Sequence, residues 1–102
     1  FVQANPVIVN ELIDGLRQTD VEGYASCCDA LAKADLREKI ALIKTPTLIV
    51  AGSHDPVTTV ADADAMAEKI AGSSRVDLNA SHLSNIEASE AFNHALEGFL
   101  KG

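Results

Sequence analysis

The sequence predicts an α/β protein whose second half is a parallel β-α-β-α unit. Residues 47–52 read Thr-Leu-Ile-Val-Ala-Gly, a continuous apolar run that is typical of a strand buried on both faces of a parallel sheet. A shorter run over residues 75–79, in which Val76 and Leu78 alternate with polar side chains, predicts a second strand. Apolar residues at helical spacing lie between the two runs and after them. Because the strands are joined through a helix, we expect them to be parallel with a right-handed crossover.

Residues 1–44 carry helical signals instead of strand signals. Pro6 directly follows an asparagine, which suits the first position of a helix capped by that asparagine. Asp20 is expected to cap a second helix that runs to about Lys33. Apolar residues at helical intervals within residues 35–43 predict a short third helix. The predicted order is therefore three helices, followed by strand, helix, strand and helix.

The two helices of the second half have their own boundary signals. Thr58 and Thr59 are alternative N-caps for the helix that follows the first strand, and Gly72 is expected to end it. A polar loop over residues 79–85 leads into a final amphipathic helix. Its larger apolar side chains are expected to face inward, and they are Phe92, Leu96, Phe99 and Leu100.

The first predicted strand is too apolar for a sheet of two strands. A strand of this kind needs neighbours on both sides and helices on both faces, so the sequence predicts a piece of a larger sheet. The chain begins with Phe1 instead of methionine, which agrees with a segment preceding it in a longer parent. The unpaired apolar edge is expected to make the chain self-associate.

Composition limits the partners and the compartment. The net charge of −7 argues against a nucleic-acid partner, which requires a basic surface. No apolar run approaches the ~20 residues that span a bilayer, and no signal-peptide pattern is present, so we expect no membrane partner and a cytoplasmic location. The adjacent Cys27 and Cys28 do not form a disulfide framework and are expected to be small buried apolar groups.

Two side chains with catalytic potential follow the two predicted strands. Asp55 lies three residues beyond the first strand, and His82 lies in the loop after the second. The carboxyl ends of neighbouring parallel strands meet at one edge of a sheet, so a carboxylate and an imidazole can come together there. A carboxylate bonded to one ring nitrogen fixes the tautomer that acyl transfer requires. The alternatives are that Asp55 only forms a turn before Pro56, and that His82 only bonds nearby backbone.

The nucleophile of such a site is missing from the sequence. No serine lies in a Gly-x-Ser-x-Gly turn between a strand and a helix. The serines are Ser26, Ser53, Ser73, Ser74, Ser81, Ser84 and Ser89. The sequence has no metal-ligand cluster, phosphate loop or dinucleotide motif, so no metal and no cofactor are expected.

The residues around the two candidates resemble the α/β-hydrolases. Residues 45–55 are similar to the strand that carries the acid in that family, and residues 80–87 resemble its histidine loop, in the order acid before histidine. The more specific resemblance is to the 3-oxoadipate enol-lactonases, which typically have His-Leu-Ser-Asn and a following glutamate, as in residues 82–87. Residues 23–37 resemble their cap. The sequence departs at Ser89, where a proline is expected.

This resemblance implies a serine-type hydrolysis of a small anionic lactone in the β-ketoadipate pathway of aromatic catabolism. Asp55 is then the triad acid, and His82 is the general base and later the general acid. The resemblance implies that residues 1–44 form the end of a helical cap and its return segment. Residues 45–102 form the C-terminal β-α-β-α unit of the α/β-hydrolase core. The nucleophile and the oxyanion donors lie on an N-terminal portion, so the chain is a C-terminal fragment and is expected to be inactive alone.

Two other interpretations remain open. The parent can be another α/β-hydrolase (an esterase, a C–C hydrolase or a haloperoxidase-like enzyme), or the chain can be a non-catalytic interaction module. Arg17 and Arg37 are candidates to bind a substrate carboxylate, because arginine offers a bidentate fork, but no substrate-binding residue is assigned. His54 is expected to have no role, and His94 is expected on the solvent side of the last helix, where it lacks the partners that a metal ligand needs.

Overall fold

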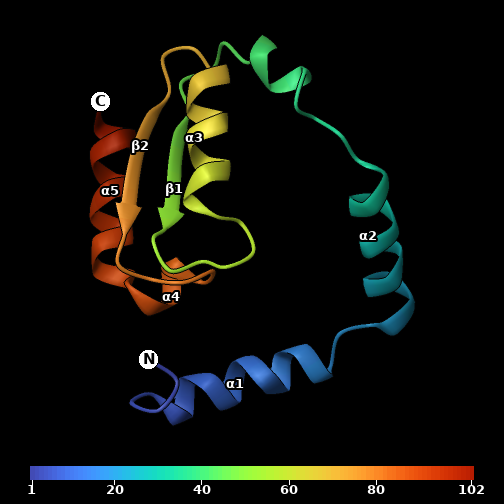
Figure 1. Ribbon diagram of the computed structural model, residues 1–102. Helices are drawn as coiled ribbons and strands as arrows, with labels where there is room; N and C mark the ends of the chain where they lie inside the picture. The colour runs from blue at the N-terminus through green and yellow to red at the C-terminus, as the bar shows by residue number, and fades with distance from the viewer. The chain divides into compact units, whose positions relative to one another are not determined.

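The computed structural model describes residues 1–102 as two compact units, residues 1–35 and residues 36–102 (Figure 1). Residues 36–44 belong to the second unit by their packing. The predicted assignment of residues 1–44 to a helical cap concerns a longer parent and stays a prediction.

The first unit consists of two helices, α1 (Pro6–Arg17) and α2 (Val21–Lys33). The predicted cap of α2 is confirmed, because the Asp20 carboxylate accepts a hydrogen bond of 2.7 Å from the backbone N–H of Gly23. Proline occupies the first turn of α1 as predicted, but Asn5 makes no side-chain capping bond. The Asn5 side-chain amide instead donates to the carbonyl oxygen of Phe1 at 2.9 Å, so it stabilises the turn before the helix.

Neither helix of the first unit contains a buried residue. The apolar stripe of α1 is exposed, with 63% of Leu16 accessible to solvent. Cys27 and Cys28 are also exposed, so the prediction that they are buried is wrong. The physical reason is that each helix can bury its apolar stripe only against another surface, which this unit does not supply.

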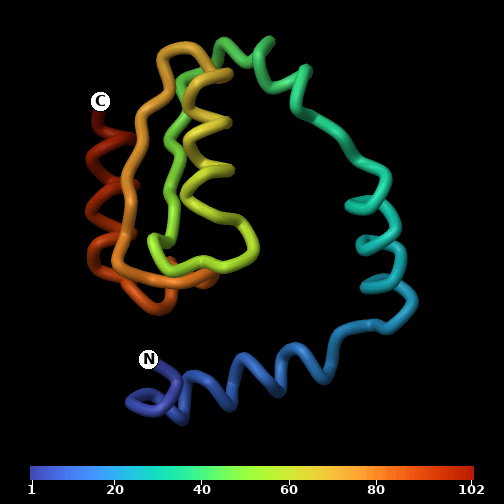
Figure 2. Tube along the Cα trace, in the orientation of Figure 1, coloured from blue at the N-terminus to red at the C-terminus, as the bar shows by residue number.

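The second unit is a parallel pair of strands between two helices (Figures 1 and 2). β1 (Leu48–Gly52) pairs with β2 (Ser74–Leu78) in parallel, from Leu48 opposite Ser74 to Gly52 opposite Leu78. The crossover helix α3 (Val60–Lys69) and the final helix α5 (Ser89–Lys101) flank the strands from opposite sides. The predicted strand, helix, strand and helix order is confirmed.

Two details of the second unit differ from the sequence prediction. The predicted third helix is only a single 3-10 turn, η1 (Lys39–Leu42), because the backbone is already extended at Ile43, with φ of −70° and ψ of 121°. The predicted polar loop over residues 79–85 ends in a further short helix, α4 (Ser84–Glu87). Ala88, with φ of −126° and ψ of 50°, lies outside helical geometry and separates α4 from α5.

The core lies between β1 and α3. Ile49 and Ala51 point from β1 onto Ala63 of α3, with Ala67 packed beside them. Leu96 and Leu100 of α5 are 38% and 72% exposed, so the prediction that these two side chains face inward is wrong, whereas Phe92 and Phe99 are half-buried. No helix is long and apolar enough to cross a membrane.

Candidate active site

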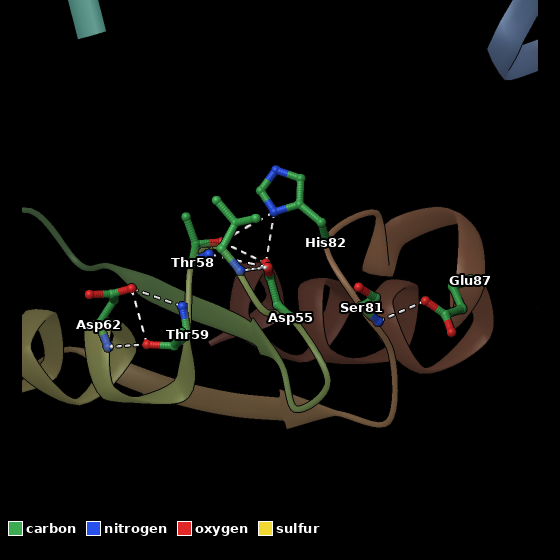
Figure 3. A network of polar contacts seen from close by, with 8 residues as sticks. Asp55, Thr58, Thr59, Asp62, Ser81, His82 and Glu87 are labelled. Carbon is green, nitrogen blue, oxygen red and sulfur yellow. Dashed lines mark hydrogen bonds and ion pairs between the residues drawn. The ribbon is translucent and has the colours of Figure 1, made fainter. Parts of the chain in front are cut away.

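The candidate site lies where both strands end. Asp55 is in the loop that follows β1, and His82 is in the loop that follows β2 (Figure 3). Two backbone bonds extend the pairing beyond the strands, because the N–H of Ser53 donates to the carbonyl of Leu78 and the N–H of His54 donates to that of Ala80, at 2.8 Å and 3.0 Å. The parallel register therefore continues into the loops and holds them side by side.

Gly52 permits this close approach of the two loops. A Cβ atom at Gly52 would lie 2.6 Å from the carbonyl oxygen of Ala80 and would overlap that of Ser81. Both obstacles are backbone atoms, so no side-chain rotation can relieve the overlap. The last residue of β1 must therefore be glycine for the histidine loop to pass against it.

The Asp55 carboxylate is buried and fully bonded. Its side chain is 4% exposed. Oδ1 accepts from the backbone N–H groups of Val57 and Thr58 at 2.9 Å and 3.1 Å, and Oδ2 accepts from the Thr58 hydroxyl at 2.6 Å. The Thr58 hydroxyl, followed by the His82 N–H, holds the pKa of Asp55 well below its ordinary value, because both bonds favour the charged form. Asp55 is therefore an anion at neutral pH.

His82 meets this anion through one ring nitrogen. Its Nδ1 lies 2.7 Å from Oδ2 of Asp55, which confirms the prediction that the two side chains come together. An ionised carboxylate only accepts hydrogen bonds, so Nδ1 carries the proton and Nε2 carries a lone pair. The His82 side chain is 61% exposed, and the edge of its ring opposite Nδ1 points away from the carboxylate, as Figure 3 shows. This arrangement leaves Nε2 as a basic nitrogen that faces solvent and can reach a further group placed over the ring.

Glu87 fixes the backbone next to His82. Its Oε2 accepts a hydrogen bond of 2.7 Å from the backbone N–H of Ser81, and this bond ties the histidine loop to α4 (Figure 3). In the sequence, Glu87 is only the last residue of the histidine-loop motif, which predicts no role for its side chain. The short sequence distance between Ser81 and Glu87 was the only available signal, and it does not reveal a bond.

The two candidate caps of α3 have separate functions. Thr59 is the N-cap, and it exchanges hydrogen bonds with Asp62 in a capping box. Thr58 contacts Asp55 and His82 instead. The two threonines are equivalent in the sequence, because adjacent residues of the same type carry no signal that separates them.

The remaining histidines and arginines named from the sequence do not belong to the Asp55–His82 pair. His54 does not join it, and its Nε2 lies 2.6 Å from Oδ1 of Asn79, so this contact links the two loops. His94 is on the exposed side of α5. Arg17 lies 3.5 Å from Asp14 on α1, and the carbonyl of Arg37 accepts a bond from Lys69.

The side chains also offer no metal site. No group of three or more histidine, cysteine, aspartate or glutamate side chains is placed to hold a metal ion.

A parallel β-α-β-α unit with a buried carboxylate against an exposed imidazole at its strand ends is typical of one class of enzyme. The fold is that of an α/β-hydrolase. Residues 17–102 match the α/β-hydrolase family described as TAP-like protein, and the chain belongs to that family.

Individual relatives are similar over almost the whole chain. The 3-oxoadipate enol-lactonase 2 of Acinetobacter baylyi is 50% identical over 101 residues, which are 99% of this chain and 38% of that protein. The crystal structure of the enol-lactonase from Burkholderia xenovorans matches with a TM-score of 0.97 at 42% identity, over 99% of this chain and 39% of that one. The pyrrolizixenacetamide deacetylase of Xenorhabdus hominickii is 30% identical over 94 residues, 92% of this chain and 34% of that protein. The chain thus spans well under half the length of each relative.

Proposed function

We propose that the chain is the C-terminal part of a 3-oxoadipate enol-lactonase, in which Asp55 and His82 are the acid and the base of a serine-hydrolase triad. The contact between Oδ2 of Asp55 and Nδ1 of His82, at 2.7 Å, carries the proposal. The 50% identity to an enol-lactonase supports the choice of substrate. On this proposal the reaction belongs to the β-ketoadipate pathway of aromatic catabolism. The cytoplasmic location and the absence of nucleic-acid and membrane partners stay predictions.

The chemistry follows from the free Nε2 of His82. This nitrogen takes the proton of a serine hydroxyl as the serine oxygen attacks the lactone carbonyl. The ring C–O bond breaks, and the imidazolium gives the proton to the leaving enol oxygen, whose enol then tautomerises to the ketone. His82 next deprotonates a water molecule that attacks the acyl-enzyme, which releases the second carboxylate and restores the serine. Asp55 stabilises the imidazolium in both halves of the reaction.

The serine and the oxyanion donors are supplied, in this proposal, by an N-terminal portion of the parent. Loss of the nucleophile alone typically costs a factor on the order of 10⁶ in turnover, so the 102-residue chain is inactive by itself. Residues 1–44 then form the end of the cap and its return segment, and residues 45–102 form the end of the core. The exposed apolar stripes of α1 and α2 support the cap assignment for residues 1–35, because they are suited to pack on further structure.

The chain in isolation self-associates, in the same proposal, through the unpaired edge of β1. That strand is apolar along its length, with Leu48, Ile49 and Val50, whereas β2 carries Arg75 and Asp77. Charged residues protect a sheet edge and apolar ones do not, so β1 is the edge that recruits a partner. Sedimentation of the isolated chain is expected to give dimers or larger species, and a stable monomer at high concentration would contradict this part of the proposal.

Replacement of the matching segment of the Acinetobacter baylyi enol-lactonase by this chain tests the substrate assignment. The two segments are 50% identical, so the hybrid is expected to fold and to hydrolyse 3-oxoadipate enol-lactone. The same hybrid with its nucleophilic serine changed to alanine is the control. A folded hybrid with no activity on the lactone would overturn the proposal.

A second candidate substrate class is an acylated amine. The 30% identity to a deacetylase favours it, since the same acid–histidine pair serves amide hydrolysis. Comparison of kcat/KM of the hybrid for the lactone and for an N-acetyl amide separates the two, and we expect the lactone to be preferred.

A further inference from the structure

We propose that Thr58 is a positioning residue of the acid–histidine pair. Together with Asp55, it holds His82 in the tautomer that leaves Nε2 free to act as a base. This inference rests on the proposed function of the site. The Thr58 hydroxyl lies 2.6 Å from Oδ2 of Asp55 and 3.2 Å from Nδ1 of His82, while these two atoms are 2.7 Å apart. Figure 3 shows the three groups converging on one another.

The Thr58 hydroxyl can favour one tautomer of His82 because of where its own proton points. A hydroxyl group has a single proton to donate. At 2.6 Å from an anionic carboxylate, the Thr58 proton points to Oδ2 of Asp55. The side of the Thr58 oxygen that faces Nδ1 of His82 is then a lone pair. A lone pair attracts an N–H and repels an unprotonated nitrogen, so Thr58 and Asp55 both favour the tautomer with the proton on Nδ1.

His82 depends on these two contacts because little else restrains its ring. The side chain is 61% exposed, and its hydrogen bonds are those to Asp55 and Thr58. A ring that is largely in solvent otherwise rotates and exchanges tautomers freely. The Thr58 hydroxyl also supports the partner, because it is one of three donors besides His82 that hold the Asp55 carboxylate in place.

The neighbouring Thr59 provides a matched control for this role. Thr59 caps α3 through its bonds with Asp62, and its hydroxyl makes no hydrogen bond to Asp55 or His82. Thr58→Val removes the hydroxyl that contacts Asp55 and His82. Thr59→Val removes the neighbouring hydroxyl, which caps α3. Thr58→Ser keeps the hydroxyl at the pair and tests for rescue.

The experiment has two readouts. Nitrogen-15 NMR of His82 in the 102-residue chain reports the tautomer directly, and kcat of the hybrid enzyme reports catalysis. We expect the wild-type chain, Thr58→Ser and Thr59→Val to hold the proton on Nδ1. In Thr58→Val, Asp55 acts on the ring alone and has lost one of its own donors, so we expect a measurably larger share of the tautomer with the proton on Nε2. In the hybrid, Thr58→Val is expected to lower kcat about tenfold with KM unchanged, which is the effect of one hydrogen bond to a charged group. Thr58→Ser recovers most of that loss.

Three results would overturn the proposal. One is a wild-type His82 that mixes tautomers as free imidazole does. Another is a Thr58→Val chain that keeps the proton on Nδ1 as completely as the wild-type chain does. The third is a Thr59→Val variant that disturbs the tautomer as much as Thr58→Val. A hybrid that is inactive on the lactone refutes the proposed function but leaves the NMR comparison to decide the role of Thr58.

Discussion

Nδ1 of His82 lies 2.7 Å from Oδ2 of Asp55, although 27 residues separate the two along the chain. The parallel register of β1 and β2 places both loops at one edge of the sheet, and Gly52 lets them touch. Backbone N–H groups and the Thr58 hydroxyl keep the carboxylate ionised. The pair is therefore preorganised by the second unit alone, before any contribution from the rest of a parent enzyme.

Asp55→Asn is expected to lower kcat of the hybrid by about 10³- to 10⁴-fold. The asparagine amide can donate to Nδ1 and so favours the wrong tautomer, which is the known effect of this change in serine hydrolases. Binding of the lactone does not use this group, so KM is expected to change little. Steady-state kinetics of the two proteins measures both constants, and a loss of less than about tenfold would exclude Asp55 as the triad acid.

Gly52→Ala is expected to disturb the site through the backbone. The new Cβ would overlap the carbonyl oxygen of Ser81, so the two loops must separate and the Asp55–His82 contact must lengthen. Overpacking of this kind typically costs about 1–3 kcal/mol of the free energy of unfolding. Gly98→Ala is the control, because a Cβ there meets no atom within 4 Å and alanine favours helix. Denaturant unfolding should show a loss for the first variant and no loss for the second.

Glu87→Ala is expected to loosen the histidine loop. The backbone N–H of Ser81 loses its acceptor, and an unpaired group of this kind costs about 1–3 kcal/mol. Glu87→Gln keeps a side-chain oxygen at the same place and should retain most of the stability. Glu90→Ala, at an exposed position of α5, is the control for loss of charge. Equal stability of the Glu87→Ala and Glu90→Ala variants would show that the bond to Ser81 does not contribute.

The low pKa of Asp55 predicts how stability depends on pH. The folded state lowers the pKa of this carboxyl below its value of 3.8 in the unfolded chain, so the ionised group stabilises the fold above that pH. The stabilisation is lost as the pH falls from about 4 through the folded-state pKa. The wild type should therefore lose stability more steeply than Asp55→Asn between pH 5 and pH 2. Parallel curves for the two proteins over this range would contradict the account.

The fold was predictable where the signal is local. The apolar run of β1, the proline at the start of α1 and the Asp20 cap each act through neighbouring residues, and all three are found. The third helix was predicted wrongly because its apolar spacing is helical, but the backbone turns to an extended conformation at Ile43, on its way into β1.

The site was predictable only in part, for a topological reason. The rule that parallel strands end at one edge brings Asp55 and His82 together without knowledge of other contacts. The bonds of Thr58 and Glu87 depend on how the two loops fold against each other. Thr58 and His82 are 24 residues apart, and no spacing or periodicity predicts that the Thr58 hydroxyl contacts both the acid and the imidazole.

The most direct test of the central claim is kcat of the hybrid enzyme on 3-oxoadipate enol-lactone after His82→Ala. His94→Ala, on the exposed side of α5, is the matched control. We expect the first change to lower kcat by at least about 10³-fold, since His82 acts as both base and acid, and the second to leave it unchanged. A His82→Ala hybrid that keeps its activity within about threefold would contradict the account, because a change so small is below the contribution of any general base.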